Sequence, residues 1–108
     1  MTDGTCRILR TLGLGAKAGK LVFGTEAVCD ALRNGKAAAV AVASGNSENT
    51  LKRLRDQCFF YRVEPVVLDA TPTELGHAVG KKGTVAAVAV TDPSLAASFL
   101  SAAGRIQQ

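Results

Sequence analysis

The stretch AGKLVFGTEAVCDALRNG, residues 18–35, contains the local signals from which the rest of the fold can be worked out. A short apolar turn, Leu21-Val22-Phe23, leads to a break at Gly24, and a helical pattern then begins at Thr25. The apolar residues of this pattern recur at helical spacing: Val28, Ala31 and Leu32. Thr25 is predicted to be the N-cap, because its hydroxyl can accept from a free amide of the first turn. Gly35 is predicted to be the left-handed residue that ends the helix.

This stretch also has the features of an anion site. Lys20 precedes the glycine-led start of the helix by a few residues. Unpaired amides at a helix N-terminus, together with the helix dipole, favour a phosphate group. An ordinary junction between a loop and a helix has the same spacing, so both interpretations stay open at this point.

Length and composition predict a single domain over residues 1–108, with a buried core and frayed ends at 1–4 and 105–108. The chain has 108 residues and is 47% hydrophobic, which is enough to bury a core. It contains no apolar run near 18 residues and no secretory leader pattern, so we expect a cytoplasmic protein without membrane contact. The three cysteines are too widely spaced for a disulfide framework or a metal site: Cys6, Cys29 and Cys58.

The formal net charge is +4, and it is unevenly distributed. Residues 1–62 carry ten basic and five acidic side chains, whereas residues 63–80 carry three acidic and no basic ones. Such asymmetry permits a basic face that binds a polyanion, although it does not require one.

Helical and buried apolar segments alternate along the chain. Helices are expected over 5–18, 25–34 and 47–61, after Thr71, and after Asp92. Strands are expected over 37–43, 66–68 and 84–91. The clearest local signal is Thr71-Pro72-Thr73-Glu74, a capping box with proline at the first helical position. This alternation predicts an α/β fold, a three-layer α/β/α domain around a mostly parallel or mixed sheet.

Several catalytic interpretations fail on context. The GxGxxA match at 13–18 lies in a helical pattern and does not follow a strand, so no dinucleotide site is expected. His77 could act with a thiol only if the thiol were exposed, and Cys29 and Cys58 fall on inward faces. The sequence therefore predicts a protein that is not an enzyme and that has no cofactor, metal site or small-molecule substrate.

The basic positions remain as candidates. Lys20 with Gly24-Thr25, and the loop Lys81-Lys82-Gly83, flank element ends that can share one edge of the sheet. Lysines and backbone amides are the groups that contact phosphates. Aromatic residues that could stack on unpaired bases are scarce, with Phe59, Phe60 and Tyr61 clustered at the end of one helix. This scarcity favours a folded RNA over an unstacked strand.

Five motifs follow one another along the chain: AKAGKLVFG at 16–24, RNGKA at 33–37, SENT at 47–50, the turn from Cys58 through Tyr61 to Val63, and ELGHAVGK at 74–81. Through these motifs the chain resembles the ribosomal L7Ae and L30e superfamily of kink-turn RNA-binding proteins, and in particular its bacterial YlxQ-like branch. The resemblance is collinear from about Leu12 to Leu100.

The resemblance implies an α/β/α sandwich with a four-stranded mixed sheet, and RNA contact through the helix at 25–34 and the loop before the last strand. In kink-turn binders a Gly-Thr-Asn-Glu run, followed by a lysine, contacts sheared G·A pairs. Gly24 and Thr25 match this run, whereas Glu26, Ala27 and Asp30 replace its asparagine, glutamate and lysine. The family loop that packs on a flipped base is apolar, and here it is the polar stretch 81–84.

We therefore predict a non-catalytic RNA-binding protein that recognises a structured, kink-turn-like RNA. The candidate RNA-binding residues are Lys20, Gly24, Thr25, Glu26, Lys36, Lys81, Lys82, Gly83 and Thr84. The resemblance also suggests the ribosome, or transcription and translation factors, as partners. The alternative is a protein-interaction module on the same fold with a degenerate RNA site.

Overall fold

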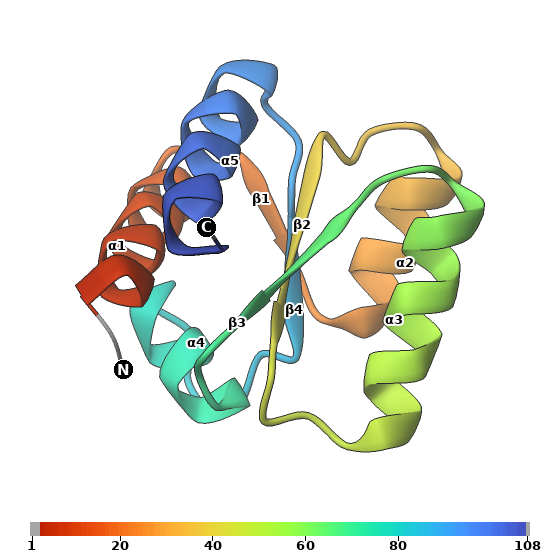
Figure 1. The fold of residues 1–108 in the computed structure, drawn as a ribbon, viewed down its shortest axis with the longest axis horizontal. Helices are drawn as coiled ribbons and strands as arrows, with labels where there is room; N and C mark the ends of the chain where they lie inside the picture. The colour runs from red at the N-terminus through yellow and green to blue at the C-terminus, as the bar shows by residue number, and fades with distance from the viewer. Residues whose placement is uncertain (1–2, 108) are drawn as a thin grey trace.

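The computed structural model describes residues 3–107, and the burial of side chains over residues 5–103 (Figure 1). The helices are α1 (Asp3–Lys17), α2 (Thr25–Arg33), α3 (Glu48–Phe60), α4 (Pro72–Ala78) and α5 (Pro93–Gln107). The strands are β1 (Leu21–Phe23), β2 (Ala39–Ala43), β3 (Pro65–Leu68) and β4 (Ala87–Val90). None of the helices in the described part of the chain has the length and apolar character needed to cross a membrane.

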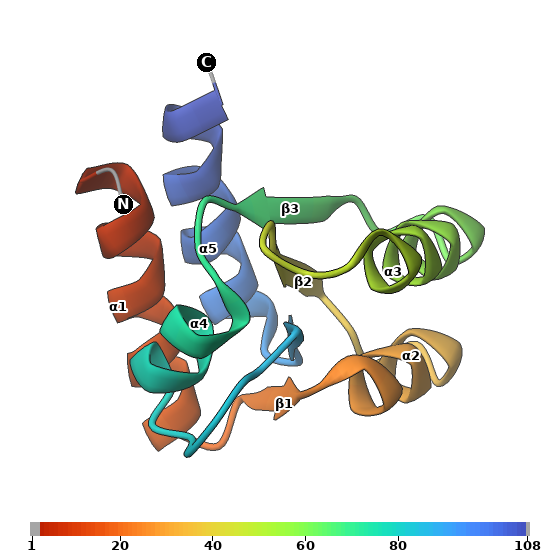
Figure 2. The same ribbon diagram turned by 90° about the horizontal axis from the view of Figure 1, so that it is seen from below.

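The four strands form one mixed sheet in the order β1-β4-β2-β3. Strand β4 pairs antiparallel with both β1 and β2, and β2 pairs parallel with β3. Helices α1, α4 and α5 cover one face of the sheet, and α2 and α3 cover the other (Figures 1 and 2). The predicted three-layer α/β/α sandwich is therefore confirmed.

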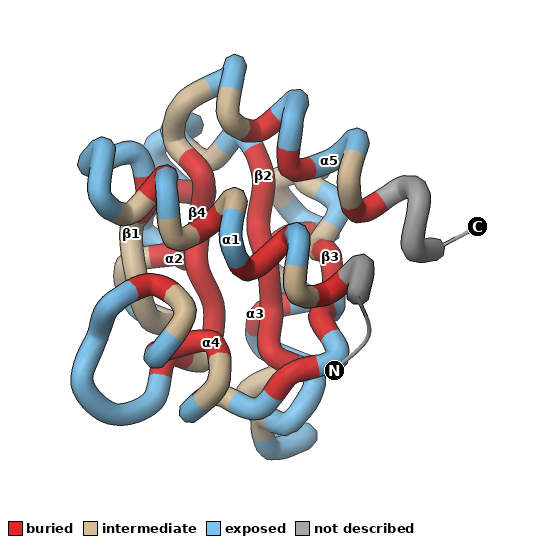
Figure 3. Tube along the Cα trace, turned by 90° about the vertical axis from the view of Figure 1, so that its left-hand side faces the viewer, coloured by how far each residue is buried: buried red, intermediate tan, exposed pale blue. Residues whose placement is uncertain are grey.

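The core consists of two apolar clusters, one on each face of the sheet. The central strands supply both clusters because alternate side chains of a strand point to opposite faces. From β2, Ala41 belongs to the cluster under α1, α4 and α5, while Val40 and Val42 belong to the cluster under α2 and α3. Every residue of β2 and β4 is buried (Figure 3). The prediction that 37–43 contains a strand covered on both faces is confirmed.

Two predicted segments differ from the structure. Leu21–Phe23 is a strand and not a turn, because it pairs with Val88–Val90. The strand predicted over 84–91 is shorter, since β4 begins only at Ala87. The amide of Val85 donates to the carbonyl of Pro72 at 3.0 Å and so is engaged by α4 instead of the sheet.

The predicted fraying of residues 1–4 and 105–108 stays a prediction. Residues 1–2 and 108 lie outside the described part of the chain, and the backbone of 3–4 and 105–107 belongs to α1 and α5.

Candidate nucleic-acid interface

The start of α2 and the loop over residues 80–84 meet at one end of the sheet, where β1 ends and β4 begins. The amide of Gly24 donates to the carbonyl of Ala87 at 2.9 Å, which fixes the start of α2 beside the start of β4. The Nζ of Lys81 lies 4.6 Å from the centre of the Phe23 ring, a cation–π contact that joins the loop to β1. The structure therefore brings together most of the predicted RNA-binding residues: Gly24, Thr25, Glu26, Lys81, Lys82, Gly83 and Thr84.

Lys20 and Lys36 lie at the other end of the sheet. The carbonyl of Lys20 accepts from the amide of Thr91, and its Nζ lies 3.6 Å from a carboxylate oxygen of Asp92. Lys36 comes two residues before Ala38, whose amide donates to Val90 at the same end of β4. The length of β1, about 10 Å, separates this end from Gly24. The predicted sharing of one edge by Lys20 and the loop is therefore not observed.

The N-terminus of α2 lacks a side-chain cap. Its N-cap is Gly24, at φ 93°, and no side-chain hydrogen bond caps the helix. The prediction that Thr25 is the N-cap is wrong, because Thr25 is already the first helical residue. The amide of Val28 donates to the carbonyl of Gly24, which is the first hydrogen bond of the helix. The amides of residues 25–27 lie ahead of this bond.

The following three helices begin differently, since each has a side-chain cap. Ser47 Oγ accepts from the amide of Thr50 at the start of α3, and Asp92 accepts from the amide of Leu95 at the start of α5. Thr71 and Glu74 form the complete capping box that the sequence predicts at the start of α4. Among α2, α3, α4 and α5, only α2 thus presents first-turn amides that no side chain caps, and such amides bind anions.

Glu26 stands on this first turn and is held by an arginine of the neighbouring helix. Its carboxylate lies 2.6 Å from Nη1 of Arg53 on α3, and both side chains are largely exposed. The hydrogen bond and the charge of Arg53 lower the pKa of Glu26, so this carboxylate is ionised at neutral pH. Arg53 was not among the residues predicted for the site. The sequence carries no signal for it, because its contact depends on how α3 packs on α2.

Asp30 and Arg33 form a second ion pair, one helical turn apart on the exposed face of α2. Asp30 stands where kink-turn binders have a lysine, and Arg33 supplies a positive charge next to it. Together the two ion pairs balance both carboxylates of α2 with arginines. Lys81 and Lys82 take part in no ion pair within the described part of the chain.

Every residue of the loop over 80–84 is exposed, and the loop is nevertheless held by contacts with α4 (Figure 3). The amide of Lys81 donates to the carbonyl of Gly76 at 2.9 Å. A Cβ atom at Gly76 would lie only 2.4 Å from the carbonyl oxygen of Gly83, so α4 and the loop touch through a position without a side chain. This close contact fixes the loop in front of β1 and α2.

The geometry argues against catalysis by Cys29 or Cys58. Burial raises the pKa of the Cys58 thiol to about 11, and burial also raises the pKa of Cys29. Cys29 is buried on α2 and Cys58 on α3, whereas His77 is exposed on α4, which covers the other face of the sheet (Figure 1). Within residues 3–107, no group of three His, Cys, Asp or Glu side chains could hold a metal ion.

Comparison with known proteins gives matches over most of the chain. An "RNA-binding protein YlxQ" of Bacillus subtilis is 37% identical over 90 residues, covering 83% of this chain and 88% of the relative. A "large ribosomal subunit protein eL30" of Archaeoglobus fulgidus is 38% identical over 76 residues, covering 70% of this chain and 84% of the relative. These relatives are named as RNA-binding or ribosomal proteins and not as enzymes.

Two solved structures share the fold. A protein of unknown function from Bacillus halodurans superposes with a TM-score of 0.84 at 30% identity, covering 91% of this chain and 97% of that one. A 15.5 kDa RNA-binding protein of Giardia lamblia superposes with a TM-score of 0.80, covering 99% of this chain and 90% of that one. At 16% identity this second likeness concerns the fold alone. The model of the ribosomal protein L7Ae/L30e/S12e/Gadd45 family matches residues 7–99, and the chain belongs to that family.

Proposed function

We propose that this protein binds a structured RNA with a surface made of the first turn of α2 and the loop over residues 80–84. The observation that carries the proposal is the uncapped N-terminus of α2, next to the two lysines of the loop. The RNA-binding relatives and the family membership support the same conclusion.

Each part of this surface has a distinct role in the proposal. The amides of residues 25–27 donate to a phosphate that approaches along the axis of α2, and Gly24 leaves room for it because nothing lies within 4 Å of its missing Cβ. Lys81 and Lys82 neutralise neighbouring phosphates. Glu26, held by Arg53, is a hydrogen-bond acceptor for the N2 amino group of a guanine.

The preferred RNA is a kink-turn, because sharp bending brings phosphates and purine edges together on one side. Glu26, Ala27 and Asp30 change the side chains that contact the bases, but they leave the helix N-terminus open. We therefore propose that the kink is recognised mainly by shape and phosphate position, in a ribosome-associated or transcription-associated RNA.

The test compares the wild-type protein on a kink-turn RNA and on a straight duplex of the same length, across a salt series. Tighter binding to the kink-turn is the expected result. Equal and strongly salt-dependent binding to both RNAs would remove the kink from the proposal and leave a phosphate-binding protein. Absence of binding to either RNA would overturn the proposal and favour the protein-interaction module.

A further inference from the structure

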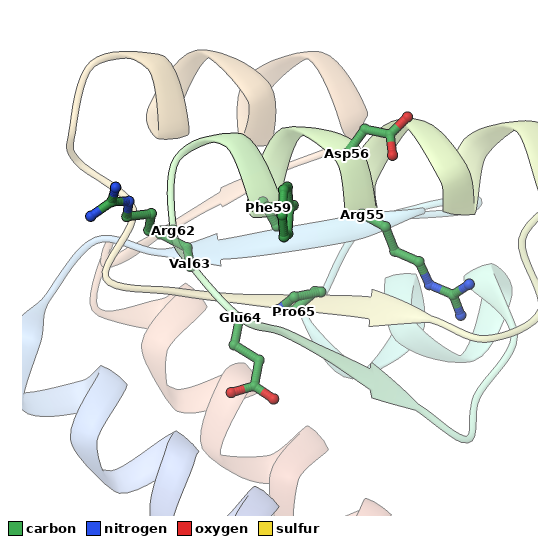
Figure 4. A pocket seen from close by; sticks show the side chains of 8 residues that line it. Arg55, Asp56, Phe59, Arg62, Val63, Glu64 and Pro65 are labelled. Atoms are coloured by element: carbon green, nitrogen blue, oxygen red, sulfur yellow. The ribbon is translucent and has the colours of Figure 1, made fainter.

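A second surface lies at the far end of α3, where the helix turns into β3. Phe59 stands over an open pocket with Val63 and Pro65 beneath it (Figure 4). The Phe59 side chain is 87% exposed, so both faces of its ring are open to solvent. An aromatic ring left this open forgoes the free energy that its burial would supply, about 1.5–3 kcal/mol.

Two arginines flank the ring. Arg55 and Arg62 line the pocket, and their side chains extend in opposite directions from it with Phe59 between them, so that both guanidinium groups point outward from the ring (Figure 4). The carboxylates of Asp56 and Glu64 point away from the ring, one above α3 and the other below the strand (Figure 4). In the part of the chain that the structure describes, neither arginine takes part in an ion pair, so both remain available to an anion.

The backbone conformation of Arg62 is an independent indication that its side chain has a function. Arg62 has φ 60°, the only positive φ of a non-glycine residue in the described chain. It occupies the position after the C-cap of α3, where the left-handed conformation favours glycine. The corresponding residues after α1, α2 and α4 are all glycines with positive φ: Gly19, Gly35 and Gly80. A glycine at this position would relieve the backbone strain, so the presence of arginine indicates that its side chain has a function.

We propose that this pocket binds unpaired nucleotides that flank the structured RNA, with one base stacked on Phe59 and its phosphates on Arg55 and Arg62. The inference rests on the proposed function, because the structured element would deliver its flanks to α3. The pocket and the first site lie toward opposite ends of the sheet, because Pro65 pairs with Val40 near the start of β2, whereas α2 begins beside the start of β4. The flanking strand would therefore run along α3, which carries both Phe59 and Arg53, the partner of Glu26.

Nucleotides fit these observations better than a protein segment does. A protein anchor usually fills a recessed pocket, whereas Phe59 projects from the surface and offers flat faces. Stacking of a base on an aromatic ring, with arginines on the phosphates, is how proteins hold single strands without regard to sequence.

The test uses the full chain and two RNAs, a kink-turn element alone and the same element with an unpaired extension of about ten nucleotides. The extension is expected to tighten binding to the wild type about tenfold, and F59A should lose this gain while binding the bare element normally. F60A is the matched control, because Phe60 is also exposed, at 75%, but does not line the pocket. F60A should keep the gain.

A second readout reports stacking directly. The chain has no tryptophan, so F59W provides a single indole whose fluorescence a stacked base quenches. Quenching by the extended RNA and not by the bare element is expected.

No gain from the extension, equal loss in F59A and F60A, or unchanged F59W fluorescence would each overturn the inference. If the bare element fails to bind, the proposed function fails separately. Titration of F59W with the free ten-nucleotide strand then decides the inference alone, since quenching supports it and no change overturns it.

Discussion

Substitution of Gly76 by alanine tests whether α4 holds the RNA-binding loop in place. The new Cβ would lie 2.4 Å from the carbonyl oxygen of Gly83, where an ordinary contact is at least 3.4 Å. The neighbouring atom is backbone, so it cannot rotate away as a side chain can. Either the loop over 80–84 or α4 must therefore move by about 1 Å.

The magnitude follows from two opposing effects. Overpacking of a tight contact costs about 1–3 kcal/mol. Replacing a glycine within a helix by alanine returns about 1 kcal/mol. We expect G76A to lower the free energy of unfolding by about 1 kcal/mol in urea titrations. The displaced loop should also weaken binding to a kink-turn RNA several-fold, because Lys81 and Lys82 move with it.

G15A is the matched control. Its Cβ would also lie 2.4 Å from another atom, but that atom is Cδ2 of Leu95, the end of a flexible side chain. We expect G15A to keep or raise the stability and to bind RNA like the wild type. A G76A variant with wild-type stability and wild-type RNA affinity would refute the idea that α4 supports the loop.

Two further predictions concern stability. R62G should raise the free energy of unfolding by about 0.5–1 kcal/mol, because relief of about 1–2 kcal/mol of left-handed strain exceeds the entropy cost of glycine. A melting temperature of R62G at or below that of the wild type would contradict this prediction. Glu74 has a lowered pKa because its carboxylate accepts from the amide of Thr71. Its stabilising effect is therefore present above the ordinary glutamate pKa, and it is lost as the pH falls through the lower pKa of the folded state. E74Q should therefore lose less stability than the wild type between pH 5 and pH 3, and parallel acid titration curves would show that the capping carboxylate does not contribute.

Local sequence signals predicted those elements whose stability is local. The periodicity of α2, the capping box of α4 and the continuous apolar run of β2 each lie within a few residues, and the structure confirms all three. Strand β1 was not predicted, because a segment of three residues is too short to show a periodic pattern. Its strand character comes from pairing with Val88–Val90, more than sixty residues away.

The site was predictable only in part for the same reason. The resemblance to a known family predicted that the start of α2 and the loop before β4 form one site. No local sequence pattern links these two segments. It could not show that Lys20 and Lys36 lie at the opposite end of the sheet, because this depends on the antiparallel pairing of β1 and β4. The pairing of Glu26 with Arg53 likewise depends on the packing of α3 against α2.

The central claim is that the structured RNA element is bound at the end of the sheet where α2 begins, and not at the end that holds Lys20 and Lys36. The most direct measurement compares K81Q/K82Q with K20Q/K36Q, which remove the same charge from the two ends, by the salt dependence of binding to a kink-turn RNA. We predict that K81Q/K82Q weakens binding and lowers the salt slope by about 2, one for each lost phosphate contact, while K20Q/K36Q changes little. A larger loss in K20Q/K36Q than in K81Q/K82Q would contradict the account.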